Sequence, residues 1–411
     1  MSDKINNVIE WAYKSFVPKE TDVLKIKSAA EWVKNFILLR SKALGTKITA
    51  EFGGSYAKNT WVRDNSDVDI FVSFDSEKKT KLLENLVPSS FKQERGTRTY
   101  FRGESGGITV EIIPVVRFND ITKVENSIDL SILHAAYINS RMKEKLRKDT
   151  VILKEFCKAN GRYGSETYIH GFSGYSLELL IIKYGGLKEL FQAVSSWMPG
   201  VYVDIENAYP DQSKALEAIG ARESPLILVD PTNPKRNVCG SLNAENFAGL
   251  VFAVKRFMTG PSKEFFVRKD SVKQIIGTSK SRGTKLFRYK TEIKGPRDRF
   301  LSKYNKGLFR LVKALKENGV GVYDYKPLYS ERKVELFLEI ESTPVTKTRK
   351  VYGPNVWLNL ENFQKFLKQH PNTYLSGELA AYDKPYKITN FNSFIAAKLK
   401  GYIGQNSILK N

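Results

Sequence analysis

Two aspartates, Asp67 and Asp69, are the side chains of this sequence best suited to chemistry. They stand two positions apart, directly before or within the apolar run that continues as Ile70–Val72. In a β-strand, side chains two apart point to the same face, so the two carboxylates should lie together. A solvated strand face is the commoner explanation of an isolated Asp-x-Asp pair. Here the apolar neighbours predict a buried strand, where Mg²⁺ could compensate the paired charges through hard oxygen ligands.

A third acid, Glu111, lies in the middle of another apolar stretch, Ile108–Pro114. A lone glutamate inside such a strand is costly unless it is paired or bound to a metal. The alternative is an edge strand with Glu111 pointing to water. Because Asp67 and Asp69 need a partner if metal is held, we expect the three acids to form one metal site.

A glycine-rich turn precedes the aspartates. Gly53 and Gly54 allow the backbone to turn tightly and to approach a ligand closely. Ser55 follows where a helix is expected to begin, and the free N–H groups at such a position suit a phosphate. Taken alone this triplet is a weak signal, because most Gly-Gly-Ser sequences are plain turns.

The elements that must position these residues form a compact α/β unit that ends near residue 120. Its second helix is predicted because apolar positions recur with a period near 3.6 residues. The expected elements are helices over 4–16 and 22–43 and strands over 47–52, 68–74, 98–102 and 108–117.

A mainly helical region and a further α/β region are expected to follow. A break at Asp230–Pro234 separates the later helices of the helical region. The periodic stretches predict helices over 142–160, 173–184, 304–318 and 360–369 and a strand over 334–340. The domains are therefore expected at residues 1–125, 126–260 and 261–411.

The charge of the chain favours a polyanionic partner. Its 66 basic and 44 acidic residues give a net charge of +22, which folding does not require and which opposes compactness. Neutralisation of phosphates supplies affinity for nucleic acid. A merely soluble or thermophile-like surface is the alternative, and a membrane surface ranks third because no basic amphipathic segment stands out.

Cysteine and histidine usage excludes several other classes of site. Cys157 and Cys239 form neither a CxxC pair nor a zinc-ligand cluster, so both are expected to be ordinary core residues of a reduced, cytoplasmic protein. With three histidines in the chain, chemistry built on several histidines is not expected. No apolar run reaches the ~18 residues of a membrane span, and the start of the chain lacks an apolar signal core.

The glycine turn, the Asp-x-Asp pair and the later acid together resemble the DNA polymerase β nucleotidyltransferase superfamily. More closely, the chain resembles the archaeal-type (class I) CCA-adding tRNA nucleotidyltransferases over most of its length. The motifs that carry the resemblance are Gly54–Trp61, Ser127–His134, Tyr163–Glu166, Gly171–Tyr175, Asp230-Pro231 with Lys235–Val238, and Tyr352–Pro354. Their occurrence together and in order is specific, whereas each alone is not.

The resemblance implies an α+β protein with a polymerase β-like mixed-sheet head, a helical central domain and a C-terminal α/β body and tail that bind RNA. It implies that Asp67, Asp69 and Glu111 are catalytic and hold two Mg²⁺ ions. It places Arg236 near the incoming base. The residues that it assigns to the incoming nucleotide, chiefly to its triphosphate, are Gly54, Ser55, Lys58, Ser131, His134, Lys154 and Tyr163.

Two positions depart from the family pattern. Residue 111 is Glu where the family usually has Asp, and a misplacement of ~1 Å can slow catalysis strongly. Residue 58 is Lys where the family usually has Arg, which replaces a planar fork by a point charge. Without the resemblance, His134, Lys154 and Tyr163 would be taken for an ordinary histidine, a solvated lysine and a core tyrosine.

A basic stretch after residue 260 is expected to bind RNA. Phe287 and Tyr289 interleave with its cations, and such mixtures suit phosphate contacts and base stacking. A solvated basic face is the alternative. The residues chosen as RNA-binding are Lys280, Arg282, Lys285, Arg288, Arg297 and Arg299.

The resulting expectation is template-independent addition of C, C and A to the 3′ end of tRNA from CTP and ATP, with release of pyrophosphate. The protein would bind the acceptor and TΨC half of the tRNA. A homodimer is compatible with the sequence. A related transferase that adds only CC, only A or poly(A) is one alternative. A catalytically silent RNA-binding protein is another, suggested by the charge and by Glu111.

Overall fold

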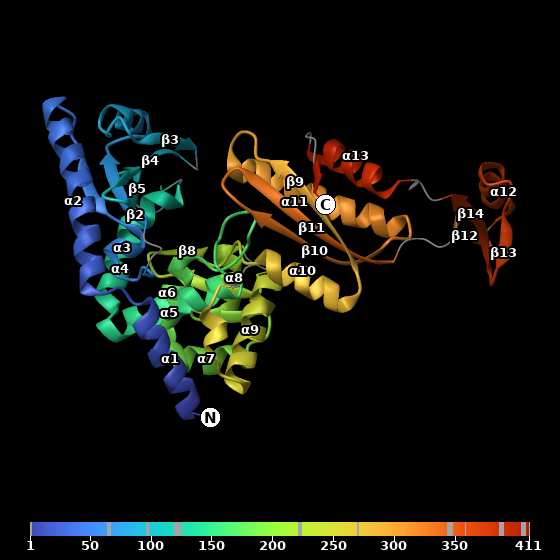
Figure 1. The fold of residues 1–411 in the computed structure, drawn as a ribbon, viewed down its shortest axis with the longest axis horizontal. Coiled ribbons are helices and arrows are strands. Elements are labelled where there is room, and N and C mark those ends of the chain that lie inside the picture. The colour runs from blue at the N-terminus through green and yellow to red at the C-terminus, as the bar shows by residue number, and fades with distance from the viewer. Residues whose placement is uncertain are drawn as a thin grey trace. The chain divides into compact units, whose positions relative to one another are not determined.

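In the computed structural model the chain forms two compact units, Met1–Lys269 and Asp270–Asn411 (Figure 1). The described residues are 2–63, 67–95, 98–118, 124, 126–220, 224–268, 271–342, 348–357, 359–385, 390–403 and 408–410. Residue 125, at the expected first domain boundary, lies outside them. The division into three domains stays a prediction.

A five-stranded mixed sheet in the first unit carries the expected acids. Its strands lie in the order β1-β2-β5-β4-β3. The central pair, β2 and β5, is parallel and the other pairs are antiparallel. The bounds are Thr49–Phe52 (β1), Asp67–Phe74 (β2), Lys92–Arg95 (β3), Thr99–Ser105 (β4) and Ile108–Val116 (β5).

The long helix α2 (Glu20–Ala43) packs along this sheet (Figure 1). Its buried positions Ile26, Ala30, Val33 and Ile37 recur every three or four residues and share one core with apolar residues of β2 and β5. Burial of this stripe fixes the helix against the sheet. The turn between β1 and β2 contains the single-turn helix α3 (Gly54–Ala57), and a 3₁₀ segment, η1 (Glu77–Asn85), follows β2.

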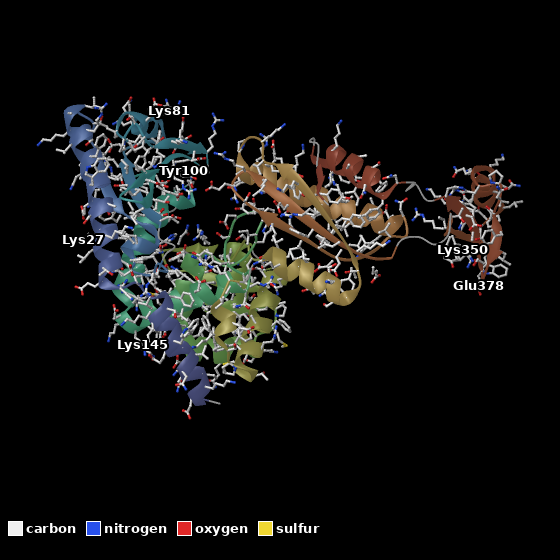
Figure 2. All side chains as sticks on the ribbon, viewed as in Figure 1. Lys27, Lys81, Tyr100, Lys145, Lys350 and Glu378 are labelled. Carbon is white, nitrogen blue, oxygen red and sulfur yellow. The ribbon has the colours of Figure 1, made fainter. Side chains whose placement is uncertain are left out.

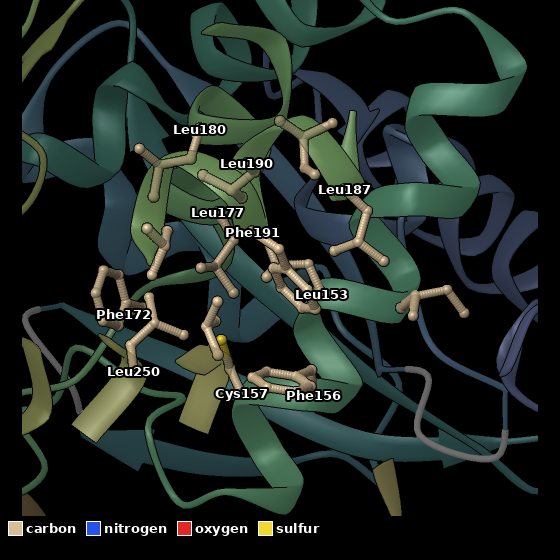
Figure 3. Packing of buried hydrophobic residues seen from close by; sticks show 14 of the residues in the cluster. Leu153, Phe156, Cys157, Phe172, Leu177, Leu180, Leu187, Leu190, Phe191 and Leu250 are labelled. Atoms are coloured by element: carbon tan, nitrogen blue, oxygen red, sulfur yellow. The ribbon is translucent and has the colours of Figure 1, made fainter. Parts of the chain in front are cut away.

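A second core in the same unit gathers helices around Phe156, Phe191 and Leu250 (Figure 3). The helices of this core are α1 (Ser2–Phe16), α4 (Ser131–Arg141), α5 (Glu144–Ala159), α6 (Gly174–Tyr184), α7 (Leu187–Val194) and α9 (Ala244–Thr259), with the 3₁₀ segment η4 (Lys263–Phe266). The unit also contains helix α8 (Gln212–Ile219) and the 3₁₀ segment η3 (Ser127–Leu130). Cys157 and Cys239 are buried and free, which confirms that they are core residues.

The mainly helical expectation overlooked three strands in this region. These are β6 (Val201–Val203), β7 (Leu226–Asp230) and β8 (Asn233–Asn237). The Asp-Pro break is a hairpin turn, because β7 and β8 pair antiparallel across it. The physical reason is the short apolar run Leu226–Val229, which is fully buried and too short for a helix of its own.

The described residues of the second unit form two sheets. A four-stranded sheet has the order β10-β11-β9-β15, and a three-stranded sheet has the order β12-β14-β13. Their strands are β9 (Lys285–Glu292), β10 (Gly321–Tyr329), β11 (Lys333–Ser342), β12 (Thr348–Asn355), β13 (Tyr374–Ser376), β14 (Leu379–Pro385) and β15 (Ile408–Lys410). The helices are α10 (Ser271–Arg282), α11 (Arg297–Glu317), α12 (Leu360–Gln369) and α13 (Phe391–Ile403).

Helix α11 begins seven residues before the predicted start at residue 304. Pro296 occupies its N-cap, and Phe300, Leu301 and Tyr304 are already buried with helical spacing. The fold class is α+β, as expected, with a mixed-sheet head. No helix among the described residues combines the length and the apolarity of a membrane span.

Candidate active site

The strand register brings the three acids to one face of the sheet. Asp69 lies opposite Glu111 on the adjacent parallel strand, and Asp67 is two positions earlier on the same strand. Side chains at paired positions and at positions two apart share a face. Because β5 is the middle strand of five, the alternative that placed Glu111 on an edge strand is wrong.

Repulsion among these acids is visible in their proton affinities. Burial, Glu111 and Asp67 together raise the pKa of Asp69 to about 7, against a small opposing effect of Lys58. Burial also raises the pKa of Glu111. Arg102 partly offsets this rise, and the charge of Asp67 adds to it. The site therefore carries more negative charge than the surrounding cations compensate, as expected of a cation-binding site.

The donor chemistry fits a hard divalent cation, but the oxygens are not gathered around one point. Among the described residues, no group of three or more His, Cys, Asp or Glu side chains is arranged to hold a metal ion. Glu111 instead approaches Arg102 on β4, with 3.6 Å between Oε1 and Nε. The structure thus places the three carboxylates on one face without assembling their ligand atoms.

The glycine turn lies against the aspartates. Gly54 has a φ of +58°, and a Cβ at this position would come within 1.6 Å of an Asp69 carboxylate oxygen. The Gly53 N–H donates to the Asp69 carbonyl at 2.8 Å, and a Cβ on Gly53 would overlap the Phe71 ring. Both glycines are therefore required for the close approach of this turn to β2. Ser55 lies in the short helix α3 that follows.

Two of the predicted phosphate ligands, Lys58 and Lys154, converge on a buried acid. The Lys58 Nζ lies 2.6 Å from Oε2 of Glu178, and the Lys154 Nζ lies 2.7 Å from Oε1 of the same carboxylate. Thr60 joins this cluster by donating its hydroxyl to Glu178 at 2.6 Å. Burial opposes ionisation of Glu178, yet Lys154 and Lys58 outweigh it and bring its pKa down to about 2.

A second buried acid, Asp230, contacts Arg236, which is predicted to lie near the base, and His134, which is predicted to contact the nucleotide. It accepts bonds from Arg236 at 2.7 Å and from the Tyr175 hydroxyl at 3.1 Å, and lies 3.2 Å from the His134 Nε2. His134 stacks on Tyr175 with 4.0 Å between ring centroids. Burial lowers the pKa of His134 although Asp230 opposes this, so the ring is held in its neutral form more than in water.

The remaining predicted nucleotide ligands lie on neighbouring elements. Ser131 is the first residue of α4 and is half-buried. Tyr163 forms a parallel bridge with Phe172, and the Lys158 Nζ lies 4.9 Å from its ring centroid. The Tyr175 ring connects the two acid clusters, because the Lys58 Nζ lies 5.7 Å from its centroid. The structure brings these residues into one region, and their roles stay predictions.

The cations predicted to bind RNA in the second unit fall into two groups. Arg282 and Arg288 pair with the buried acids Glu339 and Glu335 of β11, so they stabilise the sheet. Of the other four, Lys280, Lys285 and Arg299 are exposed and Arg297 is half-buried.

Sequence reasoning predicted Arg299 but overlooked the regular basic stripe on α11 to which it belongs. Its cations recur at intervals of three and four residues, are exposed, and make no ion pair within the described residues. They are Arg299, Lys303, Lys306, Arg310 and Lys313, with the exposed ring of Phe309 beside them. The i, i+4, i+7 spacing could have revealed them.

Glu178, Thr60 and Asp230 were also overlooked as site residues. Glu178 interrupts the apolar run of α6, and Asp230 ends the apolar strand β7. A buried acid within an apolar element is a usable signal because it requires a cationic partner. Which cation it meets depends on tertiary contacts that spacing does not reveal.

Comparisons with known proteins agree with this arrangement. Residues 33–118 match the nucleotidyltransferase domain family, and residues 148–267 match the second domain of tRNA nucleotidyltransferases. The two matches together cover half of the chain. A solved structure of a cytoplasmic RNA terminal U-transferase has a TM-score of 0.50 at 13% identity, covering 66% of this chain and 99% of that chain, which supports the fold alone.

Archaeal relatives match most of the chain. A CCA-adding enzyme of Nanoarchaeum equitans is 29% identical over 372 residues, covering 88% of this chain and 89% of that protein. A CCA-adding enzyme of Methanothermobacter thermautotrophicus is 28% identical over 370 residues, covering 85% of this chain and 79% of that protein. With its two matched domains, its archaeal relatives and its acids on one face of a mixed sheet, the chain belongs to the archaeal-type CCA-adding tRNA nucleotidyltransferase family.

Proposed function

We propose that the protein adds C, C and A in turn to the 3′ end of tRNA, using CTP and ATP and releasing pyrophosphate. The observation that carries this proposal is the placement of Asp67, Asp69 and Glu111 on one sheet face beside the glycine turn. Relatives named as CCA-adding enzymes match most of the chain, and the family uses nucleotides and divalent metal ions.

In the reaction, the RNA 3′-oxygen forms a bond to the α-phosphorus while the bond from that phosphorus to the pyrophosphate oxygen breaks. Two Mg²⁺ ions held by Asp67, Asp69 and Glu111 would supply Lewis acidity to the attacking and leaving oxygens. The chain holds the nucleotide in line through the backbone of Gly54 and Ser55 and through Lys58. The hydroxyl proton passes to solvent, so no histidine base is required.

Selection of the base is assigned to the cluster around Asp230. The side chain of Arg236 is one-third exposed, whereas Asp230 is fully buried. The buried carboxylate therefore orients the guanidinium, whose other N–H groups can donate to a ligand. His134 and Tyr175 form a stacked pair next to it. We assign to this cluster the recognition of C or A without a nucleic acid template.

The tRNA is assigned to the second unit. The α11 stripe and the exposed Lys280 and Lys285 supply cations for phosphates, and Phe309 supplies a ring for stacking. Such contacts recognise the shape of the acceptor and TΨC half of tRNA more than its sequence. A cytoplasmic location and a homodimer belong to the same proposal.

An extension assay tests this function. A tRNA lacking its last three nucleotides is incubated with Mg²⁺ and with CTP, ATP or both, and the products are sized at single-nucleotide resolution. Two additions with CTP and three with both are expected. Extension by CC only, by A only or by a long A tract would assign one of the related specificities. Salt-sensitive RNA binding without pyrophosphate release would show a silent RNA-binding protein.

A further inference from the structure

Glu178 of α6 is a fully buried carboxylate that connects two parts of the first unit. Its Oε1 accepts from Thr60 and Lys154, and its Oε2 accepts from Lys58. Lys58 and Thr60 follow the glycine turn, whereas Lys154 lies on α5. The exposed fraction of Glu178 is 0%, so these contacts replace the whole hydration shell of the charge.

The two lysines differ in the donors that they keep. The Lys154 Nζ donates to Glu178 and to both the carbonyl and the hydroxyl oxygen of Thr60, at 2.7 to 3.0 Å. An ammonium has three N–H groups, so Lys154 has none left. The Lys58 Nζ has one hydrogen-bond acceptor, Glu178, within the described residues. Lys58 therefore keeps two N–H groups for a further acceptor.

The charge of this cluster points to an anion. Two buried ammonium groups face one carboxylate, which leaves an excess positive charge in a place where unpaired charge is costly. Lys58 is the C-cap of helix α3, whose first residue, Gly54, lies against the Asp69 carboxylate. The phosphate chain of a nucleotide bound at that site would complete the coordination of Lys58.

We propose that Glu178 is a positioning residue for the nucleotide triphosphate: it fixes the Lys58 ammonium toward the phosphates, while Lys154 ties Thr60 to α5 behind it. The inference rests on the proposed function and adds a residue to it. Lys58 replaces an arginine fork by a single ammonium, whose direction is not fixed by its own geometry. The carboxylate of Glu178 supplies the direction that the lysine lacks.

The test compares Glu178→Asp with Lys58→Met and with the double variant. Glu178→Asp keeps the charge and withdraws it by about one bond length, so the KM for CTP should rise about tenfold while kcat changes less. In the Lys58→Met background the same substitution should change KM less than about twofold, because the group that it positions is gone. The inhibition constant of inorganic triphosphate, which lacks the base, should rise in parallel with KM.

Asp149→Asn is the matched control. Asp149 is also a buried acid of the first unit, where it binds Tyr13 and the Leu187 N–H. We expect this variant to lower the melting temperature and to leave KM and the inhibition constant at wild-type values. It therefore separates a general loss of stability from a loss of phosphate positioning.

Three outcomes overturn the inference: an unchanged KM in Glu178→Asp, an equal rise in KM with and without Lys58, or an equal rise in the Asp149→Asn control. If Glu178→Asp does not fold, the isosteric Glu178→Gln takes its place in the same cycle. Wild-type protein that fails to extend tRNA contradicts the proposed function. If the wild-type protein extends tRNA but the Glu178 and Lys58 substitutions change KM independently of each other, only this inference is contradicted.

Discussion

At the scale of single residues, the site is a balance between acids that repel each other and cations that are already engaged. Strand periodicity alone placed Asp67 and Asp69 on one face, whereas the position of Glu111 on that face depends on the pairing of β2 with β5. The sequence did not reveal that Lys58 and Lys154 meet Glu178, or that Arg236 meets Asp230. Those pairings join segments that are distant in the chain, and periodicity carries no information about them.

The raised pKa of Asp69 predicts that this acid destabilises the metal-free protein. Its folded pKa of about 7 exceeds the ordinary value of 3.8, so the folded state disfavours the charged form. The penalty is fully present above pH 7 and disappears as the pH falls toward 4. Asp69→Asn should therefore raise the melting temperature in EDTA at pH 8 by about 2–4 °C for each kcal/mol of relieved strain.

The rise in melting temperature caused by Asp69→Asn should be smaller at pH 5, where wild-type Asp69 binds a proton. Melting curves of both proteins at the two pH values measure it. Asp75→Asn is a useful comparison, because the pKa of Asp75 is lowered by its hydrogen bond to Lys79 and by Arg117. This substitution should not stabilise the protein. An Asp69→Asn protein that is less stable than wild type at pH 8 would contradict the explanation.

Glu111 is expected to contribute to metal binding once it leaves Arg102. Glu111→Gln keeps the size of the side chain and removes its charge, so the Mg²⁺ concentration for half-maximal extension should rise about tenfold. The measurement is a Mg²⁺ titration of extension at saturating CTP. An unchanged Mg²⁺ requirement would show that the longer acid at this position, with its 3.6 Å contact to Arg102, remains a structural partner.

At the scale of elements, the sequence predicted several long helices and the long strands of the first unit well. It did not predict β9, β10, β12 and β14 of the second unit or several short strands of the first. Helices α2, α5 and α6 have long periodic stretches, and their bounds lie within two residues of those expected. Strands β6, β7 and β8 were overlooked because three to five residues carry too little periodicity. The sequence could not decide whether the strand of Glu111 lies at the edge or in the centre of the sheet, because strand order depends on pairing and not on local pattern.

The glycine turn gives a prediction at this scale. Gly54→Ala should abolish most extension, because a Cβ there would meet the Asp69 carboxylate at 1.6 Å. Gly45→Ala is the matched control, since Gly45 also has a positive φ, of +63°, but open space around its Cβ position. Both substitutions should cost about 1 kcal/mol through backbone strain.

Extension rates and melting temperatures of Gly54→Ala and Gly45→Ala separate the effect of backbone strain from the effect of displacing the Asp69 carboxylate. We expect both variants to lose similar stability and only Gly54→Ala to lose activity. Equal activity of the two would mean that the approach of the turn to Asp69 does not matter for catalysis.

At the scale of the whole molecule, most of the net charge of +22 belongs to the second unit. Exposed lysines also stand on the outside of the first unit, among them Lys27, Lys81 and Lys145 (Figure 2). What distinguishes α11 is the regular spacing of its cations along one exposed face. The sequence predicted a basic RNA-binding region, but Arg282 and Arg288 within it proved to be partners of buried acids.

This location predicts the salt dependence of tRNA binding. Replacing Lys303, Lys306 and Arg310 together by glutamine should weaken binding and reduce the slope of log K against log salt by roughly 2 to 3. Glutamine at Lys25, Lys27 and Lys42 on α2 removes the same charge from exposed positions of the first unit. Filter-binding curves at several salt concentrations measure both, and equal slopes for the two triple variants would rule out a special role of α11.

The central claim is that the carboxylates beside the glycine turn drive nucleotide transfer. Extension of tRNA lacking its last three nucleotides, measured in single turnover with Mg²⁺ for Asp67→Ala and Asp69→Ala, tests it most directly. The rate should fall at least about 100-fold in each variant, with tRNA affinity within about threefold of wild type, because phosphate contacts supply that affinity. A normal extension rate in either variant would contradict the account.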